Sequence, residues 1–312
     1  MHAEGLTKRY GPRAAVDGIT LTVAEGEVYG LLGPNGAGKT TFLRMLFGLI
    51  RPDAGTLEVL GRSWPRDGTA TLEGVAGFIE SPRFYPYLTG RRNLQLLAGL
   101  DGGAARARID EVLDVVDLTG RDGDKVGGYS FGMRQRLGVA ASLLRDPRLL
   151  VLDEPANGLD PAGIRDMRSL VQRLAGSGLT VLLSSHDMGE VEEICDNVTI
   201  MNTGSVVYHG TITELRRQAP PQAHLLRTSD DAAALEIAAG RPGLAVTRSD
   251  GQLAVHGTQG AVDAYVAAVV VAGLALRSLT LGEAPLEALF FMLTESVPDG
   301  VPTSSTVAEP RR

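Results

Sequence analysis

Cysteine, lysine and long apolar runs are scarce in this chain of 312 residues. A single cysteine, Cys195, excludes an internal disulfide and favours a reducing compartment. The longest nearly uncharged apolar run, Ala264–Leu276, is too short to cross a bilayer of roughly 30 Å, so any membrane channel is expected on another chain. The net charge of −7 argues against a nucleic-acid partner, because proteins that bind nucleic acid usually carry a basic surface.

One of the three lysines closes a glycine-rich segment that reads GPNGAGKTT. The segment fits the phosphate-loop pattern between an expected strand, Glu27–Leu32, and an expected helix, Lys39–Leu49. In such a loop backbone N–H groups wrap phosphates, the Lys39 ammonium reaches the β- and γ-phosphates, and the Thr40 hydroxyl binds Mg²⁺. A purely structural glycine turn is the alternative, and the flanking strand and helix disfavour it. The expected nucleotide-binding residues are Gly33, Pro34, Asn35, Gly36, Ala37, Gly38, Lys39, Thr40 and Thr41.

Two acidic residues follow a strongly apolar strand, Arg148–Leu152. Open α/β sheets bind ligands at the carboxyl ends of their strands, so we expect Asp153 to hold Mg²⁺ and Glu154 to accept a proton from attacking water. His186 follows the apolar strand Leu179–Ser184 and is expected at the same edge of the sheet. We expect His186 and Lys39 to be catalytic groups in addition to Glu154. A solvated carboxylate pair and a structural histidine are the alternatives, and the phosphate loop upstream disfavours both.

The expected elements define an α/β core with a helical insertion. Strands Ile19–Val23 and Gly74–Ile79 join the apolar strands above, and Ala162–Ala175 is the crossover helix that a parallel sheet requires. Residues from about 81 to 146 are expected to form a helical subdomain.

A second domain is expected beyond the linker at Pro220-Pro221, where strand, helix, strand, strand, helix and strand follow in the ferredoxin-like order. These six elements are expected at 224–228, 231–239, 244–248, 252–256, 260–272 and 275–281. The predicted domains are therefore 1–217, an accessory α+β domain at 222–295 with a last helix at Pro285–Glu295, and a disordered tail at 296–312.

Between the phosphate loop and the acidic pair lies YSFGMRQR, at Tyr129–Arg136. Motifs in this order resemble those of the ATP-binding subunits of ABC transporters, and the resemblance covers about residues 4–217. It implies a P-loop ABC ATPase core with an antiparallel β arm and a helical subdomain. It also implies that Ser130 and Gly132 cap the γ-phosphate held by a second copy in a head-to-tail dimer. By the same resemblance the adenine-stacking aromatic is Tyr10, the D-loop is Asn157–Asp160, and the switch histidine is His186.

The chain departs from the family pattern in the signature and in the Q-loop. The signature is usually LSGGQ, and here Phe131 and Met133 replace its first glycine and its glutamine. Glu80 stands where the Q-loop glutamine is expected, and its carboxylate is a candidate metal-side group. The segment Gly77–Leu94, with that glutamate, resembles drug-export ATPases of the bacitracin-resistance type, and the C-terminal extension is similar to those of daunorubicin-type exporters. In such proteins the segment corresponding to Ser81–Leu88 contacts the membrane subunit.

The resemblance therefore implies an ATP-hydrolysing subunit of an ABC exporter, using ATP and Mg²⁺ at the cytoplasmic face of the cell membrane. Its expected partners are a second ATPase subunit, forming a homodimer, and a separate transmembrane permease for drug or antibiotic efflux. A soluble ABC ATPase acting on ribosomes or nucleic acid is one alternative, which the single cassette and acidic balance disfavour. A non-hydrolysing nucleotide-binding regulator is the other, and only Glu80, Phe131 and Met133 favour it.

Overall fold

A six-stranded sheet forms the centre of the molecule in a computed structural model that describes residues 1–100, 104–249 and 251–295. The strand order is β10-β9-β3-β8-β7-β6, and all neighbours are parallel except β10, which pairs with β9 antiparallel. Strands β3, β7 and β8 are buried along their whole length, as their continuous apolar sequences predict. The strands are β3 (Val28–Leu32), β6 (Val75–Phe78), β7 (Leu149–Asp153), β8 (Thr180–Ser185), β9 (Asn197–Asn202) and β10 (Ser205–Thr211).

An antiparallel sheet in the order β2-β1-β4-β5 forms the expected β arm. Its apolar face shares one hydrophobic cluster with helix α1 (Lys39–Leu46), including Leu6 and Ile19 of the arm and Phe42 of the helix. The arm therefore covers the helix that opens out of the phosphate loop. Its elements are β1 (His2–Tyr10), β2 (Arg13–Thr22), β4 (Ala54–Val59) and β5 (Arg62–Ser63), followed by α2 (Trp64–Asp67) and η1 (Gly68–Leu72).

Helix α1 ends at Leu46, three residues before the expected end at Leu49. Gly48 follows in the left-handed region with φ of 66°, and a Cβ there would lie 2.2 Å from the Trp64 ring. The close approach of Trp64 therefore both requires a glycine and turns the chain away from the helix axis.

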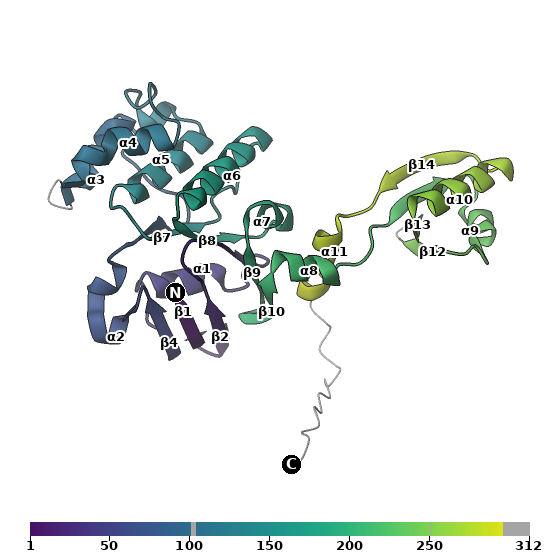
Figure 1. Cartoon of the computed structure of the whole chain (residues 1–312), viewed down its shortest axis with the longest axis horizontal. Coiled ribbons are helices and arrows are strands. Elements are labelled where there is room, and N and C mark those ends of the chain that lie inside the picture. Colours follow the sequence, from purple (N-terminus) through teal and green to yellow (C-terminus); the bar gives the residue numbers. More distant parts are fainter. Residues whose placement is uncertain (101–103, 250, 296–312) are drawn as a thin grey trace, which may run out of the picture.

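The helical subdomain and the β arm lie at opposite ends of the ATP-binding domain (Figure 1). Its α5 begins at Phe131 because Ser130 caps it, two residues before the expected start at Met133. Helix α6 is the expected crossover from β7 to β8. The elements of the subdomain are α3 (Gly90–Leu100), η2 (Ala104–Arg108), α4 (Ile109–Val115), η3 (Val126–Gly128) and α5 (Phe131–Leu143), and the crossover helix α6 spans Pro161–Gly176.

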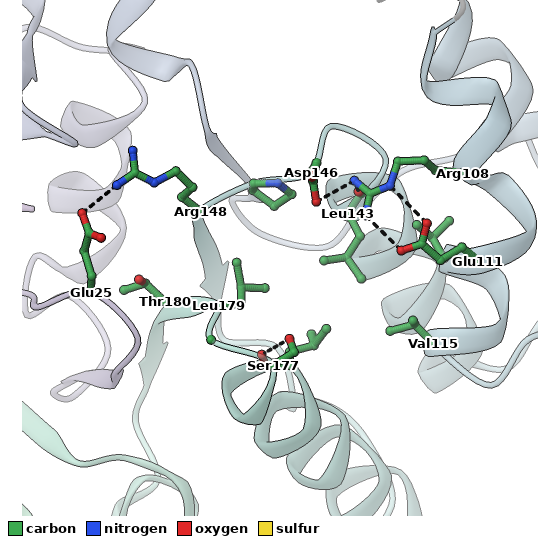
Figure 2. A pocket seen from close by; sticks show the side chains of 14 residues that line it. Glu25, Arg108, Glu111, Val115, Leu143, Asp146, Arg148, Ser177, Leu179 and Thr180 are labelled. Carbon is green, nitrogen blue, oxygen red and sulfur yellow. Dashed lines mark hydrogen bonds and ion pairs between the residues drawn. The ribbon is translucent and has the colours of Figure 1, made fainter.

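A hollow of about 400 Å³ lies at the amino ends of β7 and β8, beside α4 and the end of α6 (Figure 2). On one side of it Arg148 pairs with Glu25 at 2.8 Å, and on the other Arg108 pairs with Glu111 and Asp146 at 3.2 and 3.0 Å. Both arginines are thus neutralised within the chain. The hollow lies at the amino ends of these strands, whereas the motif residues lie at their carboxyl ends. Residues of the core and of the helical subdomain both line it.

The accessory domain has the expected ferredoxin-like order and lies beyond α8 and α11 (Figure 1). Its antiparallel sheet has the order β12-β13-β11-β14, and its core contains Leu226, Leu253, Val255 and Tyr265, all fully buried. The elements are β11 (His224–Thr228), α9 (Asp231–Ala238), β12 (Leu244–Ser249), β13 (Gln252–Gly257), α10 (Gln259–Val271) and β14 (Leu276–Leu281).

The last described helix, α11 (Pro285–Thr294), packs on the ATP-binding domain although the sequence placed it in the accessory domain. Its buried side chains, Leu286, Leu289 and Phe290, belong to the cluster that also holds α7 (Met188–Ile194) and α8 (Ile212–Gln218). Asn202 Nδ2 of β9 also donates to the Thr294 carbonyl at 3.0 Å. The chain thus leaves the ATP-binding domain after α8 and returns to it at α11. The tail expected at 296–312 lies outside the described residues.

Candidate functional site

The phosphate loop connects the buried strand β3 to α1 and approaches its neighbours too closely for side chains at two glycines. A Cβ on Gly33 would lie 2.4 Å from the Met201 carbonyl oxygen, and one on Gly38 2.3 Å from the Ala15 carbonyl oxygen. Gly38 also has φ of 110°. Only glycine therefore allows the loop to turn here with its backbone exposed to a ligand.

Lys39 lies at the centre of this loop and is only 4% exposed. Its Nζ donates to the Gly33 carbonyl at 2.6 Å and to the Pro34 carbonyl at 3.4 Å. It also lies 3.2 Å from Glu154 Oε1, across from the loop. A compact ammonium held by two carbonyls and one carboxylate fits a place for phosphate oxygens.

Asp153 ends β7 and is 4% exposed, with its carboxylate between two hydroxyls. Its Oδ2 accepts from Thr40 Oγ1 at 3.1 Å, and its Oδ1 accepts from Ser184 Oγ at 2.5 Å. Within residues 1–100, 104–249 and 251–295 no group of three or more histidine, cysteine or acidic side chains could hold a metal ion alone. Thr40 and Asp153 offer the hard oxygens that Mg²⁺ prefers, and phosphate oxygens and water would complete its shell.

Glu154 has the left-handed φ of 47°, an uncommon conformation that is often found at active sites. The backbone is fixed there because the Glu154 N–H donates to the Ser184 carbonyl and hydroxyl oxygens at 3.2 and 3.0 Å. Its carboxylate, beyond the Lys39 contact above, accepts from Asn157 Nδ2 at 2.9 Å and lies 3.2 Å from His186 Nδ1. The structure thus brings the side chains of Lys39, Glu154 and His186 together.

Ser184 contacts both acidic residues but was not among the predicted site residues, and Asn157 was expected only as part of the D-loop. The signal for Ser184 is a hydroxyl that interrupts the apolar strand TVLLSS. Buried strands rarely place a hydroxyl at the ligand end of the sheet unless it has a partner there.

A hollow of about 330 Å³ extends from the phosphate loop to the first turn of the β arm. Tyr10 lies at its edge and is 51% exposed, with Lys8 Nζ over its ring at 5.8 Å from the ring centre. Arg13 also lines it and donates from Nη2 to the Gly36 carbonyl at 3.4 Å. Arg13 belongs to no motif in the sequence, and it reaches the hollow beside the phosphate loop through the pairing of β1 with β2.

Glu80 follows β6 with φ of 63°, and its side chain turns away from the predicted metal ligands. Its carboxylate accepts from Arg44 Nη2 of α1 at 2.7 Å and is 62% exposed. Only its backbone N–H points to Asp153 Oδ2, at 3.4 Å. The structure thus pairs this carboxylate with Arg44, and its role as a metal-side group stays a prediction.

The signature begins at the N-terminus of α5, where Ser130 Oγ accepts from the Met133 N–H at 3.2 Å. The cap uses a lone pair of the hydroxyl and leaves its proton for another acceptor. A Cβ on Gly132 would lie 3.5 Å from Leu159, an ordinary contact. Among the described residues, neither Ser130 nor Gly132 lines the hollow beside the phosphate loop.

A family model described as ABC transporter matches residues 16–157. The bacitracin transport ATP-binding protein BcrA of Bacillus licheniformis is 42% identical over 68% of this chain and 70% of its own length. The daunorubicin resistance ATP-binding protein DrrA3 of Streptomyces coeruleorubidus is 43% identical over 69% of each chain. A solved structure of an ATP binding subunit of an ABC transporter is 30% identical, with a TM-score of 0.61, and covers 70% of this chain and 92% of that one.

Phosphate loop, acidic strand end and signature thus define a nucleoside-triphosphate hydrolase built on a mostly parallel sheet. The chain belongs to the ATP-binding subunits of ABC transporters. It is an ATPase that powers transport and works with a membrane permease. In the part of the chain that the structure describes, no helix is long and apolar enough to span a membrane. The alternative of an ATPase acting on ribosomes or nucleic acid receives no support from these relatives.

Proposed function

We propose that this chain powers the export of an antibiotic or another drug-like compound through a separate permease, at the cytoplasmic face of the cell membrane. The names of three relatives support export as the direction: bacitracin transport, daunorubicin resistance and linearmycin resistance proteins. The accessory domain also has the place in the chain expected for daunorubicin-type exporters.

We propose that Glu154 is the general base, and a single observation carries this: its carboxylate contacts Lys39, Asn157 and His186 at once. Glu154 would take the proton from the water that attacks the γ-phosphate. Lys39 and His186 would then stabilise charge on the departing phosphoryl group, as preorganised donors do in phosphoryl transfer.

The remaining residues of the site would bind and orient ATP. The backbone N–H groups of Gly33–Thr41 would wrap the phosphates, and Tyr10 would stack on adenine. Thr40 and Asp153 would hold Mg²⁺, which would neutralise the β- and γ-phosphate oxygens. Glu80 could join them only if its carboxylate left Arg44.

A second copy of the chain would complete the site in a head-to-tail homodimer. Ser130 still has a hydroxyl proton to donate, and Gly132 lies at the positive end of α5. These groups fit a γ-phosphate held by the phosphate loop of the other copy, since they do not line the loop's own hollow.

The permease would dock at the segment Ser81–Leu88. Phe84 packs against the main core cluster, whereas Tyr85 and Tyr87 are 55% and 65% exposed. A mostly apolar hollow of about 520 Å³ adjoins the segment, lined in part by Phe78, Pro82 and Phe84. Exposed aromatic rings beside an apolar hollow favour a protein partner.

Replacing Glu154 by Gln tests the general-base role. The Glu154→Gln variant should bind ATP but hydrolyse it roughly 10²- to 10⁴-fold more slowly, because an amide cannot accept the proton. Size-exclusion chromatography with ATP should show a stable dimer. Glu236→Gln, on the accessory domain, is the matched control and should hydrolyse ATP normally. Undiminished turnover in Glu154→Gln would remove Glu154 from this role.

The export itself is tested in inverted membrane vesicles that contain the chain and its permease. With MgATP these vesicles should accumulate bacitracin or daunorubicin, and vesicles with Glu154→Gln should not. ATP hydrolysis without accumulation of either compound would leave the ATPase in place and contradict this choice of substrate class.

A further inference from the structure

A buried carboxylate next to the switch histidine has no part in the mechanism above. Glu190 lies on α7 and is only 7% exposed. Its Oε2 accepts from Ser185 Oγ at 2.5 Å. Burial raises the pKa of Glu190, and Asp187 raises it further, while the Ser185 hydrogen bond, Arg168 and His186 lower it. A carboxyl group is costly to bury unless its hydrogen bond has a structural use.

Ser185 connects this carboxylate to the phosphate loop and to the turn that carries His186. Its carbonyl accepts from the Gly33 N–H at 3.2 Å, the first N–H of the phosphate loop. Its hydroxyl also accepts from the Asp187 N–H at 3.0 Å. With Glu190 as the acceptor of its proton, the Ser185 hydroxyl both donates and accepts.

The same turn is bound to Glu190 a second time, through the backbone. Asp187 caps α7 and accepts from the Glu190 N–H at 3.2 Å through Oδ1. The residues on both sides of His186 are therefore tied to one residue of α7, by its carboxylate on one side and its N–H on the other. This closes a ring of hydrogen bonds around the histidine's backbone.

The histidine itself is held much more loosely than this turn. His186 is 42% exposed at its side chain, and its Nδ1 lies 3.2 Å from Glu154 Oε2. A hollow of about 150 Å³ is lined by Glu154, Asn157, His186 and Glu190 together, among others. The direction of the imidazole ring thus depends on the backbone at Ser185 and Asp187.

We propose that Glu190 is a positioning residue, which holds Ser185 and Asp187 so that His186 faces Glu154. The proposal rests on the proposed function of His186 in hydrolysis. Removing the carboxylate takes away the nearer acceptor of the Ser185 hydroxyl, at 2.5 Å, and leaves the Asp187 carbonyl at 3.4 Å as its acceptor. The turn can then shift, and a displacement of a catalytic group by about 1 Å can cost as much as 10²-fold in rate.

The test combines Glu190→Ala with His186→Ala in a double-mutant cycle on the full chain. Glu190→Ala should lower kcat about tenfold with little change in KM, since it removes a bond to the turn that carries His186 and leaves the residues of the phosphate loop unaltered. In a His186→Ala background the same change should have no further effect, because both act through one group. Glu190→Gln keeps an acceptor for Ser185 and should retain most of the rate.

Two further variants separate positioning from stability. Ser185→Ala removes the same hydrogen bond from its other end, together with the bond from the Asp187 N–H. It should lower kcat at least as much as Glu190→Ala, which keeps the test valid if that variant fails to fold. Glu193→Ala, on the exposed side of α7 where it pairs with Arg168, is the matched control and should keep the wild-type kcat.

The outcomes distinguish this proposal from the proposed function itself. If His186→Ala is slow and Glu190→Ala multiplies that loss, Glu190 does not act through His186 and the positioning role is overturned. If His186→Ala hydrolyses ATP at the wild-type rate, the catalytic role of His186 falls, and the positioning role falls with it. A loss of kcat in Glu190→Ala that vanishes in the His186→Ala background supports the proposal.

Discussion

The phosphate loop and the start of α5 differ in how far the chain satisfies its own polar groups. Around the loop, Lys39, Asp153 and Glu154 are linked to one another or to neighbouring hydroxyls and carbonyls. At the start of α5, Ser130 caps the helix and still has a proton to donate, and Gly132 offers an open helix end. The polar groups around the phosphate loop are thus paired within the chain. The hydroxyl of Ser130 and the N-terminus of α5 still have hydrogen-bond donors to offer.

The difference follows from burial. Charged groups inside the core must be paired, because an isolated buried charge is very costly, so the loop side is ordered before ATP arrives. The start of α5 lies at the surface, where water satisfies its donors at little cost. A head-to-tail dimer would bring the two regions together.

The largest expected effect comes from removing the buried cation of the loop. Lys39→Ala should weaken ATP binding by about 1.5–3 kcal/mol, roughly 10- to 150-fold, and should abolish measurable hydrolysis. Titration calorimetry with ATP measures the binding, and circular dichroism checks the fold. Lys125→Ala, at an exposed lysine, is the control. Normal ATP binding in Lys39→Ala would show that the phosphate loop is not the part of the chain that binds ATP. The proposed difference between the loop and the start of α5 would then be wrong.

A change at the start of α5 should slow turnover and leave binding to the free chain intact. Gly132→Asp has room for its Cβ beside Leu159, and a carboxylate in the first turn stabilises the helix, so the fold should persist. Its negative charge would repel the γ-phosphate of the other copy and lower kcat about 10²-fold or more. Glu236→Asp is a suitable control for an acidic change far from the site. If Gly132→Asp weakened ATP binding to the monomer as much as Lys39→Ala does, the assignment of binding to the loop and of turnover to the start of α5 would be contradicted.

The smallest effect is expected at Glu80, whose N–H points to Asp153 on the loop side. Because its exposed carboxylate pairs with Arg44, Glu80→Gln should change kcat less than about threefold, as for a surface ion pair. The dependence of hydrolysis on Mg²⁺ concentration should also stay the same. A markedly higher Mg²⁺ requirement would show that this carboxylate leaves Arg44 and joins Thr40 and Asp153 when ATP binds.

The elements found from the sequence are those whose pattern is set locally. The wholly apolar strands β7 and β8 and the six elements of the accessory domain lie within a few residues of their predicted places. Strands β9 and β10 and helices α7 and α8 were not predicted. They are short and follow one another directly, so no turn or period separates them clearly in the sequence.

Helix α11 shows where a local pattern stops being informative. Its apolar residues predict a helix, but they do not specify the surface that buries them. Leu286 and Phe290 pack with α7 and α8 rather than with the neighbouring sheet of their own expected domain. That choice depends on tertiary packing, which one sequence does not reveal.

The site divides in the same way. That Lys39, Thr40, Asp153, Glu154 and His186 lie close together could be predicted, because each lies in a glycine loop or at the end of a strand in a fixed pattern. Ser184 and Arg13 reach the site through sheet pairing, and the Glu80 side chain is turned aside by Arg44. Contacts between distant segments decide these three positions.

Mixing two inactive variants tests the central claim, that the loop of one copy works with the α5 start of another. Lys39→Ala and Gly132→Asp should each be inactive alone. In a mixed dimer, one site combines both defects and the other combines an intact loop with an intact α5 start. Equal mixing should therefore restore about a quarter of the wild-type rate, since half of the dimers are mixed and each has one intact site. A mixture no more active than the sum of its parts would contradict the account.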